Sequence, residues 1–211
     1  MIKRTALLLL ILNASVSRGA EISPRRVIEN VEKALTSEKT VRLDFEETYV
    51  WKLTGEEQSL RGELLLSGKD RFRVTTEDQI IVSDGNALWT YSKPSHRVLV
   101  DRLANSENAI LPRQILFQYT RDYQSRVVGE GVYHEKPCYE LLFTSETGDV
   151  FFPEIRVWID SRDWMPIRVE QADLNDNRTV YTLENMQVGI AVEEDAFRFS
   201  VPEGAEVIDM R

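Results

Sequence analysis

Residues 62–91, GELLLSGKDRFRVTTEDQIIVSDGNALWTY, decide the fold that this sequence predicts. Apolar side chains fall at every second position of its extended segments, and they are Leu64 and Leu66, Phe72 and Val74, and Trp89 and Tyr91. A period of two places alternate side chains on one face of a β-strand. Between two of these segments stands Asp84-Gly85, and an Asp-Gly pair supplies the positive φ angles of a tight hairpin turn. The stretch therefore predicts an antiparallel sheet with one apolar face.

The same alternation continues over most of the chain, with short polar turns between the extended segments. We expect about eleven strands, at residues 41–53, 60–66, 71–76, 79–83, 87–91, 97–102, 123–128, 138–144, 154–160, 166–173 and 180–187. A short extended piece at 197–201 follows them. A sheet of this many strands curls, because each strand is twisted relative to its neighbour. The predicted fold class is mainly β (α+β), a single curved antiparallel sheet with its apolar face inside the curve.

Two short helices are expected to cover that apolar face. Residues 23–35 begin with a capping Ser23 and a Pro24 in the first turn. The apolar side of this helix is formed by Val27, Val31, Ala34 and Leu35. A second helix opens at Pro112, after a loop, and is apolar over most of its circumference. Two short helices cover a modest area, so we expect part of the apolar hollow to serve as a ligand site.

Residues 1–20 have the character of a secretory signal peptide. Lys3 and Arg4 precede an apolar run at residues 6–12, and small and polar residues follow it up to Ala20. A membrane-spanning helix needs about 20 apolar residues, so this run is too short to be one. We expect residues 21–211 to form a single soluble domain that is exported from the cytoplasm. The only cysteine, Cys138, lies far from the leader, so we expect no lipid anchor at the N-terminus.

Charge restricts the partners of the chain. The 211 residues carry a formal net charge of −9, and removing the three cations of the leader leaves 23 basic against 35 acidic side chains. An acidic domain has no electrostatic affinity for the phosphates of nucleic acid, so no nucleic-acid partner is expected. The same balance disfavours adsorption to an anionic membrane through a basic face.

Catalytic motifs are absent from the sequence. His96 and His134 are the only histidines, and Cys138 lies four residues after His134. This spacing leaves a thiolate and imidazole pair open, but no third group or oxyanion motif accompanies the two residues. A pair of carboxylates of the glycosidase type is also left open. We expect no catalytic residue, no metal site and no cofactor.

Two groups of residues form a recognisable pattern. The first group is Gly62-x-Leu64, Phe72-Arg73 and Ile80-x-Val82-Ser83-Asp84-Gly85-x-x-Leu88-Trp89-x-Tyr91, and the second is Phe197-x-Phe199-x-x-Pro202-x-Gly204-x-x-Val207. Together they resemble the periplasmic outer-membrane lipoprotein carrier family, the LolA type, which implies that the exported domain lies in the periplasm. The resemblance implies a half-open β-barrel with a helical lid over a hydrophobic cavity. It also implies a monomeric carrier that takes acylated lipoproteins from an inner-membrane ATP-driven release complex. The cargo would pass to a receptor at the outer membrane.

The resemblance assigns the inward-facing apolar residues to the walls of an acyl-chain cavity. These expected wall residues are Val41, Leu43, Phe45, Leu64, Leu66, Phe72, Val74, Trp89, Tyr91, Tyr139, Leu141, Phe143, Ile155 and Val157. The expected lid residues are Val31, Leu35, Ile115 and Leu116. Burial of each methylene contributes about 0.8 kcal/mol, so acyl chains need such shelter to cross water.

One position departs from the family pattern. The family usually places Arg-Pro in the turn before the Phe-Arg segment, where the arginine holds the lid shut. Gly68 and Lys69 stand at those positions here. Lys69 can supply a point charge as a lid residue, but it lacks the planar donor fork of an arginine.

Two other classes of function compete with the carrier. A periplasmic regulator could use the same fold to sense lipids or mislocalised lipoproteins, although the regulators of that kind carry a second domain. A secreted hydrolase is the third reading, and it would depend on His134 or Cys138.

Overall fold

The computed structural model describes residues 22–35, 40–68, 70–106, 123–145 and 150–211. Over these residues the chain forms one helix, α1 (Pro24–Ala34), and two 3-10 turns, η1 (Leu103–Ser106) and η3 (Glu194–Phe197). The strands are β1 (Val41–Val50), β2 (Glu57–Ser67), β3 (Arg71–Thr76), β4 (Gln79–Asp84), β5 (Ala87–Ser92), β6 (Arg97–Arg102), β7 (Tyr123–Tyr133), β8 (Lys136–Ser145), β9 (Glu154–Asp160), β10 (Pro166–Ala172), β11 (Arg178–Val188) and β12 (Glu206–Asp209).

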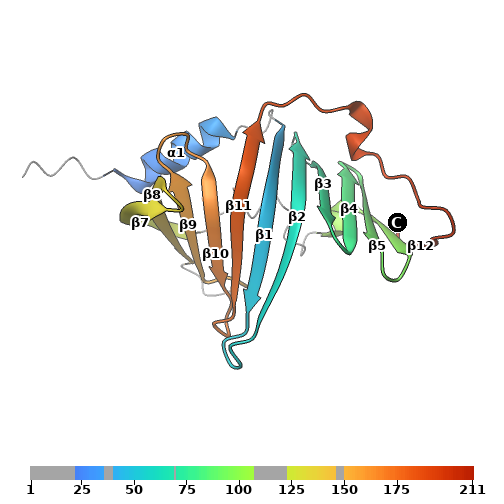
Figure 1. Cartoon of the computed structure of the whole chain (residues 1–211), viewed down its shortest axis with the longest axis horizontal. Coiled ribbons are helices and arrows are strands. Elements are labelled where there is room, and N and C mark those ends of the chain that lie inside the picture. Colours follow the sequence, from blue (N-terminus) through green and yellow to red (C-terminus); the bar gives the residue numbers. More distant parts are fainter. Residues whose placement is uncertain (1–21, 36–39, 69, 107–122, 146–149) are drawn as a thin grey trace, which may run out of the picture.

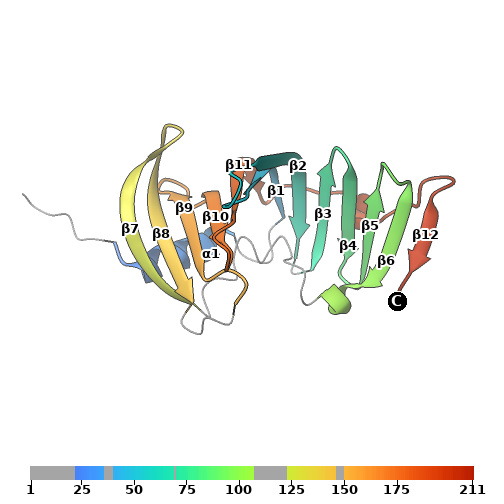
Figure 2. The same ribbon diagram turned by 90° about the horizontal axis from the view of Figure 1, so that it is seen from below.

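The twelve strands form a single open sheet, in the order β12-β6-β5-β4-β3-β2-β1-β11-β10-β9-β8-β7 (Figure 1). Within β1–β6 and within β7–β11, strands that follow one another in sequence pair in antiparallel fashion. Strand β1 joins these two halves of the sheet by pairing with both β2 and β11. The prediction of a curved, mainly β sheet is confirmed. The sheet bends along its length, and α1 lies on the inner side of the bend beside β7–β10 (Figure 2).

A hairpin turn forms at the place that the sequence predicts, but of the Asp84-Gly85 pair only Gly85 has a positive φ, and the two turn residues are Gly85 and Asn86. Gly85 has φ +102°, a left-handed conformation that glycine adopts without steric strain. The Asp84 carboxylate accepts hydrogen bonds from the backbone N–H groups of Asn86 at 2.8 Å and Ala87 at 2.9 Å. This two-residue turn fixes the register in which β4 pairs with β5.

Helix α1 also begins where the sequence predicts. The Ser23 side chain accepts a hydrogen bond from the backbone N–H of Arg26, and Pro24 occupies the first turn. Val27 is fully buried and Leu35, at the end of the helix, is 2% exposed. The helix therefore packs its apolar side against the sheet.

The C-terminal segment differs from the sequence prediction. An extended piece was expected at 197–201, but Glu194–Phe197 form the turn η3 and the last strand is β12, which the sequence reading missed. This strand pairs with β6 in parallel, so the sheet is not wholly antiparallel. A strand of four exposed residues has too few alternating side chains to show a period of two.

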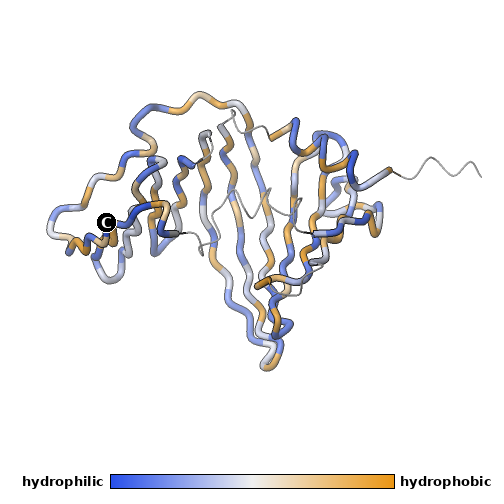
Figure 3. The backbone as a smooth tube through the Cα atoms, turned by 180° about the vertical axis from the view of Figure 1, so that it is seen from behind, coloured by the Kyte–Doolittle hydropathy of each residue, from blue (hydrophilic) through white to orange (hydrophobic). Residues whose placement is uncertain are grey.

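The two faces of the sheet are defined by the pairing register. We call the face that carries Leu43, Leu64, Val74 and Val157 the inner face, because these residues pack in one cluster with α1. The opposite, outer face carries the alternate residues, among them Asp44, Glu63 and Thr75. Figure 3 shows the resulting alternation of hydrophobic and hydrophilic residues along the strands.

Candidate functional site

The inner face brings together most of the side chains that the sequence assigns to a cavity wall. Nine of them are buried, namely Val41, Leu43, Leu64, Leu66, Phe72, Leu141, Phe143, Ile155 and Val157. Phe45, Val74 and Tyr139 are partly buried against the same cluster. The cluster spans both halves of the sheet, from β3 to β8, so residues far apart in the sequence form one continuous apolar surface.

Two of the expected wall residues do not face this surface. Phe72 pairs with Ser83, and Ser83 pairs with Leu88, so Trp89 lies on the outer face of β5. Tyr91 shares that face with Trp89 and packs against Phe199 of the C-terminal segment in a second cluster. The expectation that Trp89 and Tyr91 line the same surface as Phe72 is therefore corrected by the register.

The residues expected to form a lid are placed only in part. Val31 and Leu35 of the first helix pack in the inner-face cluster. Ile115, Leu116 and Lys69, together with the helix expected to open at Pro112, lie outside the described residues. Gly68 has φ +62°, and a Cβ built there meets nothing within 4 Å.

A polar patch interrupts the inner face near the end that carries the β1–β2 turn, and sequence reasoning missed it. We define it as Glu47, Tyr49, Gln171, Thr179 and Tyr181. Glu47 pairs with Tyr181, Tyr49 pairs with Thr179, and Thr179 pairs in turn with Gln171. The signal in the sequence was the break in period at Glu47, which stands where the alternation from Phe45 to Tyr49 calls for an apolar residue.

The surroundings of the patch change the acidity of two of its members. Burial raises the pKa of the Glu47 carboxyl, because the charged form loses hydration. Burial also raises the pKa of the Tyr181 phenol, and the negative charge of Glu47 adds to that effect. Gln171 is 1% exposed and Thr179 is 8% exposed, so the patch is set into the apolar surface.

The residues considered for hydrolysis have surroundings that do not activate the cysteine. Cys138 is buried, and this burial together with the Glu140 charge raises the pKa of its thiol, which favours the unreactive protonated form. The His134 ring stacks on Tyr133 with ring centroids 4.3 Å apart. His96 instead contacts the Tyr91 hydroxyl, with its Nδ1 2.9 Å from the phenol oxygen.

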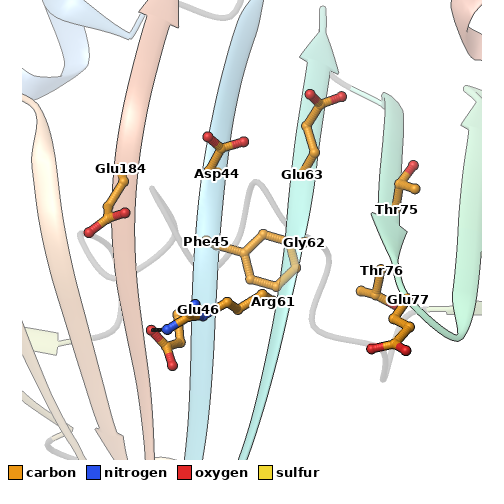
Figure 4. A pocket seen from close by; sticks show the side chains of 10 residues that line it. All are labelled: Asp44, Phe45, Glu46, Arg61, Gly62, Glu63, Thr75, Thr76, Glu77 and Glu184. Atoms are coloured by element: carbon orange, nitrogen blue, oxygen red, sulfur yellow. Dashed lines mark hydrogen bonds and ion pairs between the residues drawn. The ribbon is translucent and has the colours of Figure 1, made fainter.

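A hollow of ≈ 520 Å³ is lined by residues of β11, β1, β2, β3 and the β3–β4 turn, and its charged side chains project from the outer face (Figure 4). Its carboxylates come from Asp44, Glu46, Glu63, Glu77 and Glu184, and its one cation, Arg61, pairs with Glu46 at 3.0 Å. Placing an acyl chain here would remove ionised groups from water without compensation. The described residues contain no group of His, Cys, Asp or Glu side chains arranged to hold a metal ion.

Residues 36–200 match the family model described as outer membrane lipoprotein carrier protein LolA. The chain belongs to the LolA family. The match covers both halves of the sheet, including the strands that form the apolar inner face. Within the part of the LolA-family chain that the structure describes, no helix is long and apolar enough to cross a membrane.

Sequence comparison with individual proteins finds a named carrier and an uncharacterized relative. An outer-membrane lipoprotein carrier protein of Alkalilimnicola ehrlichii is 30% identical over 158 residues, which cover 70% of this chain and 67% of the relative. An uncharacterized protein of Methanocaldococcus jannaschii is 22% identical over 165 residues, covering 74% of this chain. The matched region spans 45% of the length of that archaeal protein.

Solved structures share the fold at low sequence identity. An uncharacterized conserved protein from Thermus thermophilus has a TM-score of 0.59 at 14% identity, covering 88% of this chain and 98% of that one. The structure of MucB has a TM-score of 0.51 at 15% identity, covering 83% of this chain and 62% of that one. At these identities the likeness shows a common fold alone.

Proposed function

We propose that this LolA-family protein carries the acyl chains of lipoproteins on the inner face of its sheet. The observation that carries the proposal is the continuous apolar surface formed by both halves of the sheet, against which α1 packs. A soluble protein commonly turns one face of such a sheet toward a core. Here the described cover consists of the short helix α1 and of single side chains such as Leu103 of η1, Phe152 and Trp164. Such a face suits a ligand whose own surface is apolar.

The physical need for a carrier follows from the chemistry of the cargo. Each methylene transferred from water into an apolar environment contributes about 0.8 kcal/mol, so a chain of sixteen carbons is held in a membrane by roughly 12 kcal/mol. A protein face that replaces the membrane contacts lowers this barrier to transfer. Val74 and Phe45 are only partly buried, and such incompletely covered side chains allow the acyl chain to leave again.

The proposed route begins with export to the periplasm and removal of the leader, which leaves residues 21–211 as the mature protein. The carrier would then accept an acylated lipoprotein from an inner-membrane ATP-driven release complex and deliver it to the outer membrane. The role is one of binding and transfer, without a covalent step. The family match and the carrier relatives support this route.

The test is a titration of the mature protein with a fluorescent diacylglycerol, a neutral probe with two acyl chains. Saturable binding at one site, displaced by an unlabelled diacylglycerol, is the expected result. The proposal fails if the probe partitions only into its own aggregates and the protein neither changes its emission nor protects it from a quencher in water.

A further inference from the structure

The inner face is not uniform along its strands. Going from the β1–β2 turn toward the other end of the strands, the first pairs are Tyr49 with Thr179 and Glu47 with Tyr181. The next pairs are apolar, Phe45 with Leu183 and then Leu43 with Leu64. The polar patch therefore lies at one end of an apolar surface that continues for several residues.

On the β2 side, the end that carries the patch is also the more open one. The β2 residues from Glu57 to Leu60 are exposed, and Leu60, which pairs with Glu47, is 42% exposed. At the opposite end of the same strand Leu64 and Leu66 are 6% and 2% exposed. An amphiphile bound along the strands would have its apolar part over the closed end and its polar part near water.

The chemistry of the patch selects the polar part. Glu47 offers carboxyl oxygens as acceptors, and the Tyr181 and Thr179 hydroxyls can donate or accept hydrogen bonds. Buried acceptors of this kind favour a group that donates hydrogen bonds, and a Glu47 carboxylate repels a second negative charge.

We propose that Glu47 and Tyr181 form the headgroup end of the ligand site, and that they select long-chain acyl compounds whose polar end donates hydrogen bonds and carries no negative charge. This inference rests on the proposed function, because it assumes that acyl chains lie on the inner face. A lipidated peptide meets the description, since its acylated end carries amide N–H groups. A free fatty acid does not, because its carboxylate would face Glu47.

The test compares two probes with the same sixteen-carbon chain, N-palmitoylethanolamine and palmitate, as competitors of the fluorescent diacylglycerol at pH 7.5. The wild-type protein is expected to bind the ethanolamide at least about tenfold more tightly, the size of effect that a hydrogen bond to a charged group produces. In Glu47→Gln the preference should fall to about threefold or less. Tyr181→Phe, which removes only a hydroxyl, should also reduce it.

The matched control is Glu46→Gln, the same change one residue earlier. Glu46 faces outward and pairs with Arg61 at 3.0 Å, so this variant should keep the wild-type preference. Equal binding of the two probes by the wild type, or an undiminished preference in Glu47→Gln, overturns the inference while leaving the carrier function in place. If the protein binds the diacylglycerol and neither competitor displaces it, the headgroup assignment is also wrong. Failure of the diacylglycerol itself to bind overturns the proposed function as well.

Discussion

Replacing Val74 by asparagine tests whether acyl chains lie on the inner face. Val74 is partly buried in the inner-face cluster, and it lies in register with Leu64 of β2 and Ile81 of β4. An amide at this position can be hydrated in the free protein, since the side chain is not fully covered. A bound acyl chain would remove that water and leave the amide without partners.

The magnitude follows from the cost of such desolvation. Burying an amide without a compensating hydrogen bond costs about 1–3 kcal/mol in proteins, which corresponds to a roughly 5- to 150-fold weaker Kd. The matched control is Thr75→Asn, the same new side chain on the next residue and on the outer face. The Kd of the control should lie within about twofold of the wild-type value, because in the proposed complex no acyl chain covers the outer face of β3.

The assay is the diacylglycerol titration, with urea unfolding of each variant as a check on folding. A folded Val74→Asn protein that binds as tightly as the wild type would refute the reasoning. So would a Thr75→Asn protein that loses affinity as much as Val74→Asn does, because the ligand would then not distinguish the two faces of the sheet.

Three further predictions concern stability, measured as the free energy of unfolding in urea. Burial raises the pKa of Glu47 in the folded state, because the buried carboxyl prefers its protonated form. Its contribution to the free energy of unfolding is therefore fully present below the unfolded pKa of about 4.3, and it is lost as the pH rises through the folded pKa. Glu47→Gln should therefore gain stability relative to the wild type between pH 4 and pH 7, and a constant difference over that range would contradict the assignment. The Asp160 carboxylate is buried and accepts hydrogen bonds from Arg162, and these bonds lower its pKa. Its contribution to the free energy of unfolding is therefore present above the unfolded pKa of about 3.9, and it is lost as the pH falls through the folded pKa. Asp160→Asn should lower the free energy of unfolding by about 1–2 kcal/mol at pH 7, a modest value because Arg162 is exposed and water screens the pair. This loss should shrink toward pH 2, and a loss of the same size at pH 2 would exclude an electrostatic origin. Gly62→Ala should destabilise the protein by about 1–3 kcal/mol, because its Cβ would lie 2.6 Å from a backbone carbonyl oxygen. Gly131→Ala has nothing within 4 Å of the new Cβ and should be close to neutral, so equal effects of the two alanines would reject this steric argument.

The strands could be predicted because their outer positions are polar and their inner positions are apolar. In β1, for example, Leu43 and Phe45 alternate with Asp44 and Glu46, and the structure places the two apolar residues on one face of the sheet and the two acids on the other. The turn at Asp84-Gly85 was equally readable, because its conformation depends on local residues. Local signals of this kind do not require knowledge of the rest of the chain.

The facing of Trp89 and Tyr91 could not be read from their own segment. The run from Gln79 to Ser83 is apolar at three successive positions, Ile80, Ile81 and Val82, so its period does not reveal which side is inner. Counting pairs across the two-residue turns would have placed Trp89 opposite Val82, on the outer side. The parallel pairing of β12 with β6 depends on a long connection, and no local pattern encodes it.

The polar patch was also missed for a physical reason. Its five residues come from β1, β10 and β11, and the two from β1 meet the other three only through the pairing of β1 with β11, more than a hundred residues later in the sequence. Glu47 alone reads as one acid among 35 Asp and Glu residues. The alternation of Phe45 and Tyr49 marks Glu47 as an inward position, but only the register shows which residues of β10 and β11 lie beside it.

Crosslinking from the inner face tests the central claim most directly. A photoreactive phenylalanine analogue would be placed at Ile81, which is partly buried in the inner-face cluster. The carrier would then be irradiated in two separate mixtures, one with an acylated lipoprotein and one with that lipoprotein lacking its acyl chains. The account predicts crosslinks to the acylated form only, and none from the same analogue at Arg73 on the outer face of the neighbouring strand. Crosslinks of equal yield from both positions, or to the form without acyl chains, would contradict it.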